Sequence, residues 1–471
     1  MELSAELVSR IDAAGERAVL RFWDRLDDAA RRGFAAQLAS VDWSGLPGLR
    51  AAIAGRDAPS AGLPDLDAAR TPPAIPIGLA NPRGDDPATV ARGADALRAG
   101  RVGAILVAGG QGSRLGHDGP KGIYRVGPVS RASLFELLLG KLVAVGRRYG
   151  RDVPLAIMTS TSTVAGTRDF LAAHGCCGLD ASRVFVFQQE DLPALDAAGG
   201  HLLLDQPGRL ALAPDGHGGL VKALRDSGGL DWFGRQGIEH VVTFQVDNPL
   251  ALPLQPAFLG AHLATAAEFT TQVVRKREPG ERVGVVVEEG GGCRIVEYSD
   301  LPAAAAAERL PDGRLRFDAG SIAVHAFSVA FLRRTSDDPR SLPLHLAFKA
   351  VPHVDGQGTR VVPAAPNAYK FERFIFDLMP LARGVCLVEV AAEEAFAPLK
   401  NPPGAASDAP EHVQAALVRQ ARRIVEATGR RVADDAVVEL ATDSIIDAAD
   451  VDRALPPGVE LAGPTLVRLP S

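Results

Sequence analysis

A glycine-rich stretch with two cations, residues 104–121, carries the clearest chemical signal in the chain. Residues 104–107 are apolar and are typical of a buried strand, and four glycines follow between positions 109 and 116. Glycines let the backbone approach a ligand closely and turn its N–H groups toward an anion. Arg114 and Lys121 add fixed positive charge nearby. The stretch predicts a phosphate-binding loop, and the alternative is a glycine-rich connection that carries two solvated cations.

Two common glycine-rich loops do not match these residues. A dinucleotide-binding loop is paired with an acidic residue at the end of the second strand, whereas the second expected strand here ends in Met158-Thr159-Ser160. A P-loop requires Gly-Lys followed by Ser or Thr, but Lys121 follows Pro120 and precedes Gly122. What remains is the pattern Gly-Gly-x-Gly-x-Arg-Leu-Gly, with Pro-Lys close behind it.

Polar residues also follow other expected strands. Gln188 and Gln189 come after an expected strand at 183–187, and Asp247 comes after another at 240–246. In open α/β sheets, ligands bind at the carboxyl ends of strands. One carboxylate together with substrate phosphates is a typical Mg²⁺ site, so Asp247 is a candidate ligand. Its alternative role is a turn cap at the start of Asp-Asn-Pro.

The elements around these residues alternate between strand and helix, which predicts an α/β fold with a mostly parallel sheet and helices on both faces. The first half has expected strands at 102–107, 154–158, 183–187 and 240–246 and helices at 87–99, 133–149 and 220–226. The second half has expected strands at 270–274, 283–288, 294–297, 315–317 and 385–390 and helices at 326–334, 368–382 and 411–428.

The length of 471 residues predicts two or three domains. A net charge of −6 argues against a nucleic acid partner, so a polyanionic substrate would depend on a few local cations and a divalent metal. The four cysteines contain no CxxC pair and are expected to be packing thiols in a reducing compartment. No leader segment or apolar run of membrane length is apparent, which predicts a soluble cytoplasmic protein. Residues 1–55 are typical of amphipathic helices, and a proline-rich tether follows at 59–82.

The ordered motifs resemble those of the eukaryotic-type UDP-sugar pyrophosphorylases, most closely the UDP-N-acetylhexosamine pyrophosphorylases. The motifs lie at 21–23, 108–116, 120–122, 157–160, 187–189, 213–216, 246–248, 296–299 and 398–401. The resemblance implies a Rossmann-like nucleotidyltransferase fold of the glycosyltransferase-A type with a mixed, mostly parallel sheet. It also implies a helical N-terminal region with the tether (1–100), a catalytic domain (101–384) and a small C-terminal domain (385–471).

The implied reaction joins UTP and a sugar 1-phosphate and releases pyrophosphate and a UDP-sugar, with Mg²⁺ as cofactor. An oxygen of the sugar phosphate attacks the α-phosphorus in line, so catalysis consists of positioning and charge neutralisation. The expected partners are therefore these small molecules, with no nucleic acid and no membrane. The expected assembly is a monomer or a weak homo-oligomer.

The resemblance also implies which residues form the site. The implied catalytic residues are Arg114, Lys121 and Lys400. The implied nucleotide-binding residues are Ala108, Gly109, Gly110, Gly112, Gln189, Gly216, His217 and Lys370. The implied sugar-binding residues are Gly284, Glu297, Tyr298 and Ser321, and the implied metal ligand is Asp247. Gln188 is an alternative to Gln189, and the alternative for Lys370 is an ordinary solvated lysine.

Two positions depart from the family pattern where the sugar is expected. The family has Asn-Ala-Gly-Asn where this chain has Asp-Ala-Gly-Ser at 318–321, and it has asparagine at the position of His217. Serine is shorter than asparagine and cannot reach the same hydroxyl without a water. N-acetylglucosamine 1-phosphate is the expected substrate. Glucose or galactose 1-phosphate, or a broad range of sugars, is the alternative, and a non-catalytic UDP-sugar-binding protein is a remote one.

Overall fold

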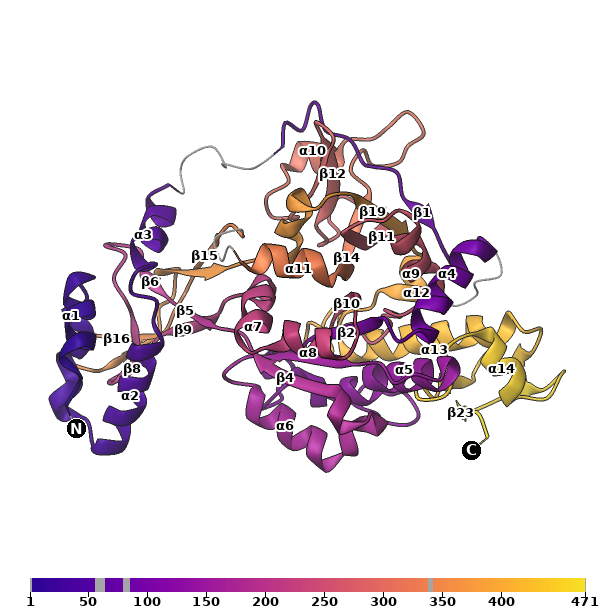
Figure 1. Cartoon of the computed structure of the whole chain (residues 1–471), viewed down its shortest axis with the longest axis horizontal. Coiled ribbons are helices and arrows are strands. Elements are labelled where there is room, and N and C mark those ends of the chain that lie inside the picture. The colour runs from indigo at the N-terminus through magenta and orange to yellow at the C-terminus, as the bar shows by residue number, and fades with distance from the viewer. Residues whose placement is uncertain (1, 56–63, 79–84, 338–341, 471) are drawn as a thin grey trace. The chain divides into compact units, whose positions relative to one another are not determined.

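One sheet of ten strands organises the larger of two units in the computed structural model (Figure 1). The structure describes residues 2–55, 64–78, 85–337 and 342–470. Unit 1 comprises Met1–Leu63, Gln189–Leu220 and Arg340–Asp377, and unit 2 comprises Pro64–Gln188, Val221–Pro339 and Leu378–Ser471. Each unit therefore combines segments that are distant in the chain.

The sheet of unit 2 is mostly parallel. Its strands in spatial order are β1 (Ile75–Pro76), β19 (Val385–Glu389), β11 (Phe269–Arg275), β14 (Ala319–Ser328), β10 (His240–Gln245), β2 (Val102–Val107), β3 (Leu155–Thr159) and β4 (Val184–Gln188). Within this order β14 is antiparallel to both of its neighbours, and the other adjacent pairs are parallel. A hairpin of β12 (Val285–Glu289) and β13 (Gly292–Val296) extends from β14. The carboxyl ends of β2, β3 and β10 consequently lie at one edge, as the sequence predicts.

Helices cover both faces of this sheet. On one face, side chains of β2, β3 and β10 share a core with α4 (Pro87–Arg98), α5 (Leu134–Tyr149), α9 (Pro256–Ala264) and α13 (Pro410–Glu426). On the other face, Phe233 of α8 (Gly229–Arg235) fits against Gly103, and Phe331 of α11 (Val329–Ser336) stacks on Phe327. The remaining α-helices among the described residues of this unit are α6 (Val164–Ala173), α7 (Leu220–Asp226, which starts at the unit boundary), α10 (Ala303–Ala307), α12 (Ala392–Ala395) and α14 (Ala448–Ala454).

Two predicted elements are wrong, and the start of a third is misplaced. Residues 315–317 form no strand, because Leu315 makes only an isolated bridge to Arg309 and its apolar side chain is simply buried. The predicted helix at 326–334 starts later, since β14 continues to Ser328, whose side chain caps α11. The predicted helix at 368–382 is instead β18 (Ala368–Glu372) followed by a 3₁₀ helix (Ile375–Leu381). Pairing of β18 with two other strands overrides its local helical pattern.

The C-terminal part of the chain has an apolar cluster of its own. It contains residues of α13 and α14 together with β20 (Arg431–Val432), β21 (Val437–Leu440), β22 (Glu460–Leu461) and β23 (Pro464–Val467). Arg148 on α5 binds Asp447 and Asp450 of this part, and these carboxylates raise the pKa of the Arg148 guanidinium. These ion pairs hold the C-terminal part against α5.

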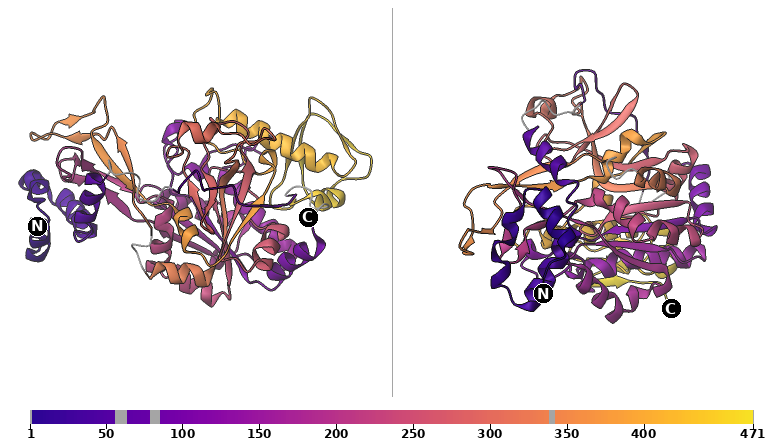
Figure 2. Two further views of the ribbon diagram at one scale, coloured as in Figure 1. Left: turned by 90° about the horizontal axis from the view of Figure 1, so that it is seen from above. Right: turned by 60° about the vertical axis from the view of Figure 1, so that its left-hand side comes forward.

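Unit 1 surrounds a second apolar core. The helices α1 (Ala5–Ala13), α2 (Asp28–Ser40) and α3 (Leu46–Ala54) and the 3₁₀ helix Arg17–Arg25 pack together (indigo in Figures 1 and 2). The strands of this unit are β5 (Asp191–Pro193), β6 (Leu195–Asp196), β7 (Leu204–Gln206), β8 (Arg209–Leu210), β9 (Leu212–Pro214), β15 (His345–Lys349), β16 (His353–Val354), β17 (Arg360–Val361) and β18. Glu16 is 1% exposed and pairs with Arg50 and His201, which ties the helices to the strand region.

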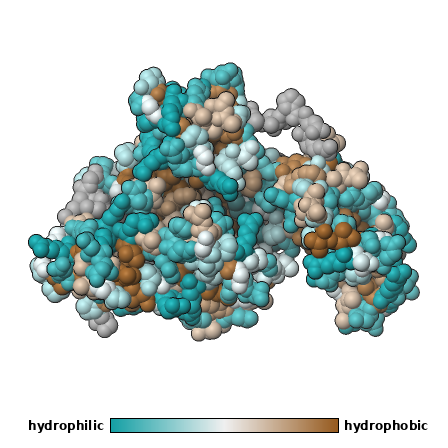
Figure 3. All heavy atoms as spheres, turned by 180° about the vertical axis from the view of Figure 1, so that it is seen from behind, coloured by the Kyte–Doolittle hydropathy of each residue, from teal (hydrophilic) through white to brown (hydrophobic). Residues whose placement is uncertain are grey.

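Part of the predicted proline-rich tether is visible as an extended segment. Ile75 and Pro76 form β1, a two-residue edge strand parallel to β19, which is a position that proline tolerates. Residues 56–63 and 79–84 of this region lie outside the described residues. In the part of the chain that the structure describes, no helix is long and apolar enough to cross a membrane. The face drawn in Figure 3 is mostly hydrophilic, with apolar residues in small groups.

The crossing of α4 and α9 requires glycine on both helices. A Cβ at Gly260 would lie 1.8 Å from the Thr89 carbonyl oxygen, and one at Gly93 would lie 1.9 Å from the Pro256 oxygen. We expect Gly260→Ala to lower the free energy of unfolding by about 3 kcal/mol, because the backbones must separate. Gly33→Ala on α2 is the matched control, since nothing lies within 4 Å of its added Cβ, and we expect it to be neutral or mildly stabilising. Urea unfolding measures both, and equal stability of the two variants would contradict the close crossing.

Candidate functional site

The glycine-rich loop after β2 is closed by its own backbone. The Gly112 N–H donates to the Gly119 oxygen at 2.9 Å, and the Lys121 N–H donates to the Gly110 oxygen at 3.0 Å. Within the described part of the chain, the N–H groups of Gly110 and Gln111 donate to no acceptor. The loop therefore presents two adjacent amide donors at the carboxyl end of β2.

Gly112 has a role inside this loop. Its N–H is already used in closing the loop, and an added Cβ would lie 2.8 Å from the His117 ring. The loop can fold back on itself at this point because position 112 has no side chain. A direct contact of Gly112 with a nucleotide stays a prediction.

A serine after β3 holds the start of the loop. The Ser160 hydroxyl donates to the Gly109 oxygen at 2.8 Å, and the Ala108 N–H donates to the Met158 oxygen at 2.8 Å. Thr163 accepts the Ser160 N–H through its own hydroxyl at 2.9 Å. The backbone of Ala108 and Gly109 is thereby fixed from the neighbouring strand.

The structure brings three predicted site residues together beside this loop. Lys121 Nζ lies 3.7 Å from Asp247 Oδ2 and donates to the Leu399 oxygen at 3.2 Å. The Leu399 N–H in turn donates to the Asp247 backbone oxygen at 2.7 Å, which places Lys400 next in the chain. The side chains of Lys121 and Asp247 are 17% and 23% exposed, so both reach solvent.

Arg114 and Lys400 are exposed at this end of the sheet. Neither side chain forms a hydrogen bond or ion pair with any residue that the structure describes. The Lys400 backbone N–H donates to the Asp408 oxygen at 2.8 Å, which fixes its main chain, and its side chain is exposed to solvent. Both cations are free to bind an anion.

Asn248 joins the loop after β10 to a distant segment. Its side chain is 2% exposed, donates to the Ala395 oxygen at 2.8 Å and accepts the Ala397 N–H at 3.1 Å. The Asp247 carboxylate, in contrast, caps no backbone N–H of the described residues. The alternative of Asp247 as a turn cap therefore finds no support in the structure.

Unit 1 carries four further predicted residues, of which Gln189 has the clearest signal. Gln189 is 4% exposed, and its Oε1 has no hydrogen-bond partner among the described residues. Gln188 of unit 2 is exposed and donates to the Thr161 hydroxyl at 2.8 Å. A buried oxygen without a donor is costly unless a ligand or water supplies one, so Gln189 is the better candidate of the two.

A buried ion pair shapes the loop that contains Gly216 and His217. Asp215 is 1% exposed and accepts two hydrogen bonds from Arg373, at 2.7 and 2.8 Å. Gly216 has a φ of 77°, and a Cβ there would lie 2.5 Å from the Arg373 oxygen. Position 216 therefore requires glycine, because a side chain there would clash with the Arg373 backbone. Lys370 lies on β18, half-buried, and not on the predicted helix.

The His217 ring is held in one tautomer. Its Nδ1 accepts the Ile375 N–H at 3.1 Å, so Nε2 carries the proton of the neutral ring. Phe374 and Phe376 lie against the ring, with centroids at 5.2 and 5.6 Å. Burial, with a smaller contribution from His345, lowers the pKa of His217 to about 4.

Three of the predicted sugar-binding residues are neighbours in unit 2. The Ser321 N–H donates to the Gly284 oxygen at 2.8 Å, and a Cβ at Gly284 would lie 3.0 Å from Glu297 Oε1. Ala323, two residues after Ser321, has a φ of 56°, which is unusual for a residue with a side chain. Tyr298 follows Glu297 and is 47% exposed. The ends of β12, β13 and β14 thus form one polar group.

The comparisons with known proteins identify the family. A family model described as UTP–glucose-1-phosphate uridylyltransferase matches residues 91–452. The chain belongs to this family. UDP-N-acetylhexosamine pyrophosphorylase-like protein 1 of Homo sapiens is 36% identical over 446 residues, which cover 92% of this chain and 88% of the relative. UDP-N-acetylglucosamine pyrophosphorylase of Saccharomyces cerevisiae is 36% identical over 358 residues, which cover 74% and 75%.

A solved structure shows the same fold. The crystal structure of the uridine diphosphate N-acetylglucosamine pyrophosphorylase from Trypanosoma brucei, in complex with an inhibitor, matches with a TM-score of 0.81 at 24% identity. The match covers 98% of this chain and 99% of that chain. The predicted resemblance and fold class are confirmed.

Several residues that shape this candidate site were missed in the sequence analysis. Arg373 gave no signal, because its partner Asp215 lies 158 positions away. Asn248 and Ser160 can be recognised in the sequence as strand-end residues, but their hydrogen-bond partners cannot. The position of Lys141 in the sequence does indicate a buried lysine, since it lies on the apolar face of the predicted helix at 133–149.

His217 makes a pH-dependent contribution to stability. The unfolded chain takes up a proton on this ring near pH 6.5, whereas the folded protein does so only near pH 4. The contribution is therefore fully present above pH 6.5, and the free energy of unfolding should fall as the pH drops from 6.5 to 4. We expect His217→Gln to flatten this decline in urea unfolding measured at several pH values. The exposed His412→Gln is the control, and an equal decline in wild type and His217→Gln would contradict the assignment.

Proposed function

We propose that the protein is a uridylyltransferase that forms UDP-N-acetylglucosamine and pyrophosphate from UTP and N-acetylglucosamine 1-phosphate. The observation that carries this proposal is the meeting of Lys121, Asp247 and the 399–400 segment beside a loop with two free amide donors. The names of the relatives at 36% identity support the choice of sugar.

The reaction needs charge neutralisation and alignment and no protein nucleophile. The amides of Gly110 and Gln111 would donate to oxygens of the triphosphate, as glycine-rich turns do in anion sites. Lys121 would hold the α-phosphate and the departing pyrophosphate, and the exposed Arg114 would pair with the β- and γ-phosphates. Lys400, next to Leu399 in the chain, would add positive charge on the same substrate. These side chains would hold the sugar phosphate oxygen in line with the α-phosphorus.

Asp247 fits a divalent metal that is bound together with substrate. The described residues include no group of three or more His, Cys, Asp or Glu side chains that could hold an ion alone. A partly exposed carboxylate beside a phosphate loop is instead typical of Mg²⁺, which keeps water and phosphate oxygens as its other ligands. When bound, Mg²⁺ would neutralise phosphate charge. Asp247 would anchor it at the end of β10.

The base and ribose are assigned to backbone and amide groups. Gln189 Oε1 is a buried acceptor without a donor, which suits the imide N–H of uracil. The backbone of Ala108 and Gly109, held by the bonds described above, would supply the other contacts to the base. Gly216, His217 and Lys370 are proposed as further nucleotide contacts on the strength of the family resemblance.

The hexose is assigned to Gly284, Glu297, Tyr298 and Ser321. The first, second and fourth of these form the polar group at the ends of β12, β13 and β14. Glucose or galactose 1-phosphate, or a broad range of sugars, is the second candidate, because Ser321 has a shorter side chain than the family's asparagine. His217 also differs from the family, and its Nδ1 is already bonded to Ile375. The residues at these two positions favour contacts to the sugar that differ from those of the family's asparagines.

The setting of the reaction is inferred from composition. The four cysteines are free thiols, which agrees with a reducing compartment and a cytoplasmic location. The negative net charge supports small-molecule partners and no nucleic acid. We infer a monomer or a weak homo-oligomer that requires no membrane.

The reaction and the sugar are tested together by pyrophosphate release. The protein is mixed with UTP, Mg²⁺ and, in turn, the 1-phosphates of N-acetylglucosamine, N-acetylgalactosamine, glucose and galactose. We expect the highest kcat/KM with N-acetylglucosamine 1-phosphate, by about tenfold over glucose 1-phosphate. A site that hydrogen-bonds a substituent of the sugar leaves its polar groups unpaired when the sugar lacks that substituent. Chelation with EDTA should abolish turnover. Absence of turnover with all four sugars would contradict the proposed function, and equal turnover would favour the broad-specificity candidate.

Lys121 is the direct test of the phosphate placement. We expect Lys121→Ala to lower kcat/KM by about 100-fold or more, because a cation that faces developing phosphate charge is lost. Lys222→Ala is the matched control, since Lys222 pairs with Asp226 on the surface of α7. Circular dichroism verifies that both variants are folded. Turnover by a folded Lys121→Ala variant at the wild-type rate would place the phosphates elsewhere.

A further inference from the structure

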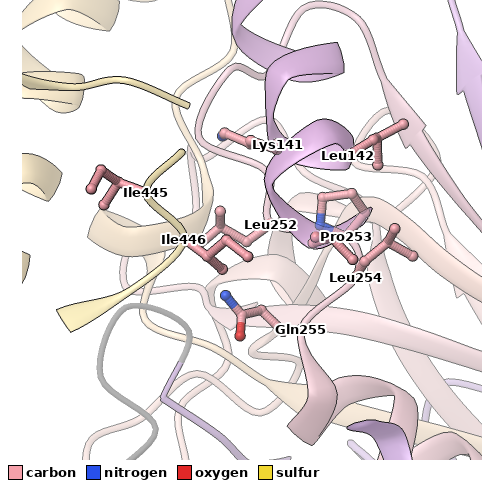
Figure 4. Close-up of a pocket in the computed structure, with 9 residues that line it drawn as sticks. Lys141, Leu142, Leu252, Pro253, Leu254, Gln255, Ile445 and Ile446 are labelled. Carbon is pink, nitrogen blue, oxygen red and sulfur yellow. The ribbon is translucent and has the colours of Figure 1, made fainter. Parts of the chain in front are cut away.

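A buried lysine lies directly behind the loop that carries Asp247. Lys141 is on α5, on the helix face that also buries Leu137, Leu142 and Val145, and it is 8% exposed. Figure 4 shows it with Leu142 on α5, near Leu252 and Pro253 of the loop after β10 and Ile446 of the C-terminal part. A charged group in apolar surroundings is costly unless it is bonded, so its placement requires an explanation.

The Lys141 ammonium is bonded to the backbone of this loop. Its Nζ donates to the carbonyl oxygen of Pro249 and to that of Ala251, the latter at 2.9 Å. These residues come two and four positions after Asp247. Burial lowers the pKa of Lys141 to about 7. The lysine thus fixes two carbonyls that would otherwise be buried without donors.

Two more buried side chains connect the loop after β10 to the 394–399 segment by hydrogen bonds. Gln420 on α13 donates to the Leu250 oxygen at 3.4 Å and to the Glu394 oxygen. Asn248 bonds Ala395 and Ala397, as described above, and the Leu399 N–H reaches the Asp247 oxygen. The loop after β10 and the segment that ends at Lys400 are therefore held as one body. Lys141 supplies the member of this framework that donates to two carbonyl oxygens.

We propose that Lys141 is a positioning residue for the uridylyl transfer, which fixes Asp247 and the 399–400 segment relative to Lys121 through the carbonyls of Pro249 and Ala251. This inference rests on the proposed function. A space-filling role would be met by the leucine or valine that α5 uses at neighbouring positions, and these cannot donate to two carbonyls. Displacement of a reacting group by about 1 Å costs on the order of 100-fold in rate, so loss of this hold should be visible in kcat.

The kinetic test compares Lys141→Met, Lys141→Arg and Arg148→Met. We expect Lys141→Met to lower kcat by about 100-fold, with KM for the sugar 1-phosphate within about threefold of wild type, because the sugar site is untouched. Lys141→Arg keeps a charged donor and should recover most of this loss. Arg148→Met is the matched control on the same helix. It breaks the pair with Asp447 and Asp450 and should lower the melting temperature while kcat stays within about twofold.

Three kinetic outcomes would overturn the proposal. A folded Lys141→Met variant with wild-type kcat would show that catalysis does not need the bonds from Lys141 to Pro249 and Ala251. A Lys141→Arg variant as impaired as a folded Lys141→Met variant would show that charge and donors are irrelevant. If Lys141→Met does not fold, Lys141→Gln replaces it, since its amide keeps donors without charge. Its kcat should then fall by about tenfold, and an unchanged kcat would contradict the proposal.

Amide hydrogen exchange separates this inference from the proposed function. The N–H groups of Ala397 and Leu399 are bonded to Asn248 and Asp247 and should exchange slowly in wild type. We expect their exchange to accelerate at least tenfold in Lys141→Met, or in Lys141→Gln if that replaces it, and to be unchanged in Arg148→Met. Unchanged exchange in the Lys141 variant would refute positioning even in an active enzyme. Absence of turnover by wild type would refute the proposed function and leave the exchange result to decide the role of Lys141.

Discussion

A single backbone hydrogen bond, from the Leu399 N–H to the Asp247 oxygen, is the contact on which the candidate site at the carboxyl end of β10 depends. It joins the end of β10 to a segment far away in the chain, and Lys121 bonds the same Leu399 from the glycine-rich loop. Three segments that could bind phosphate thereby meet at one point. Each is short and irregular, so their relative positions must be set by bonds to the rest of the fold.

Buried polar groups set those positions, and the apolar core makes them effective. Ser160 holds Gly109, Asn248 holds the 395–397 segment, and Lys141 holds the carbonyls after Asp247. In a low-dielectric interior such bonds are strong, and leaving any of them unmade is costly. The tight crossing of α4 and α9 fixes two of the helices that pack against the sheet, and Gln420 on α13 donates to the Leu250 and Glu394 oxygens. The C-terminal part thus contributes to the site without touching substrate.

The sequence predicted the parts of the site that depend on local pattern. The strand at 102–107, its glycine loop and the start of α5 at Ser133 were found correctly, because turn and cap chemistry is local. Lys370 was placed on a helix because the strand pairing that fixes β18 is non-local. The pair of Asp215 and Arg373 and the acceptors of Lys141 were invisible for the same reason. Long-range partners leave no periodic signal along the chain.

The most direct test of the account is a crystal structure with UDP-N-acetylglucosamine and Mn²⁺, whose anomalous scattering locates the metal. We expect the diphosphate on the amides of Gly110 and Gln111, and the metal about 2.1 Å from an Asp247 carboxylate oxygen. Lys121 should bridge the phosphates and the Leu399 oxygen. A diphosphate bound away from the glycine-rich loop, or a metal without contact to Asp247, would contradict the account.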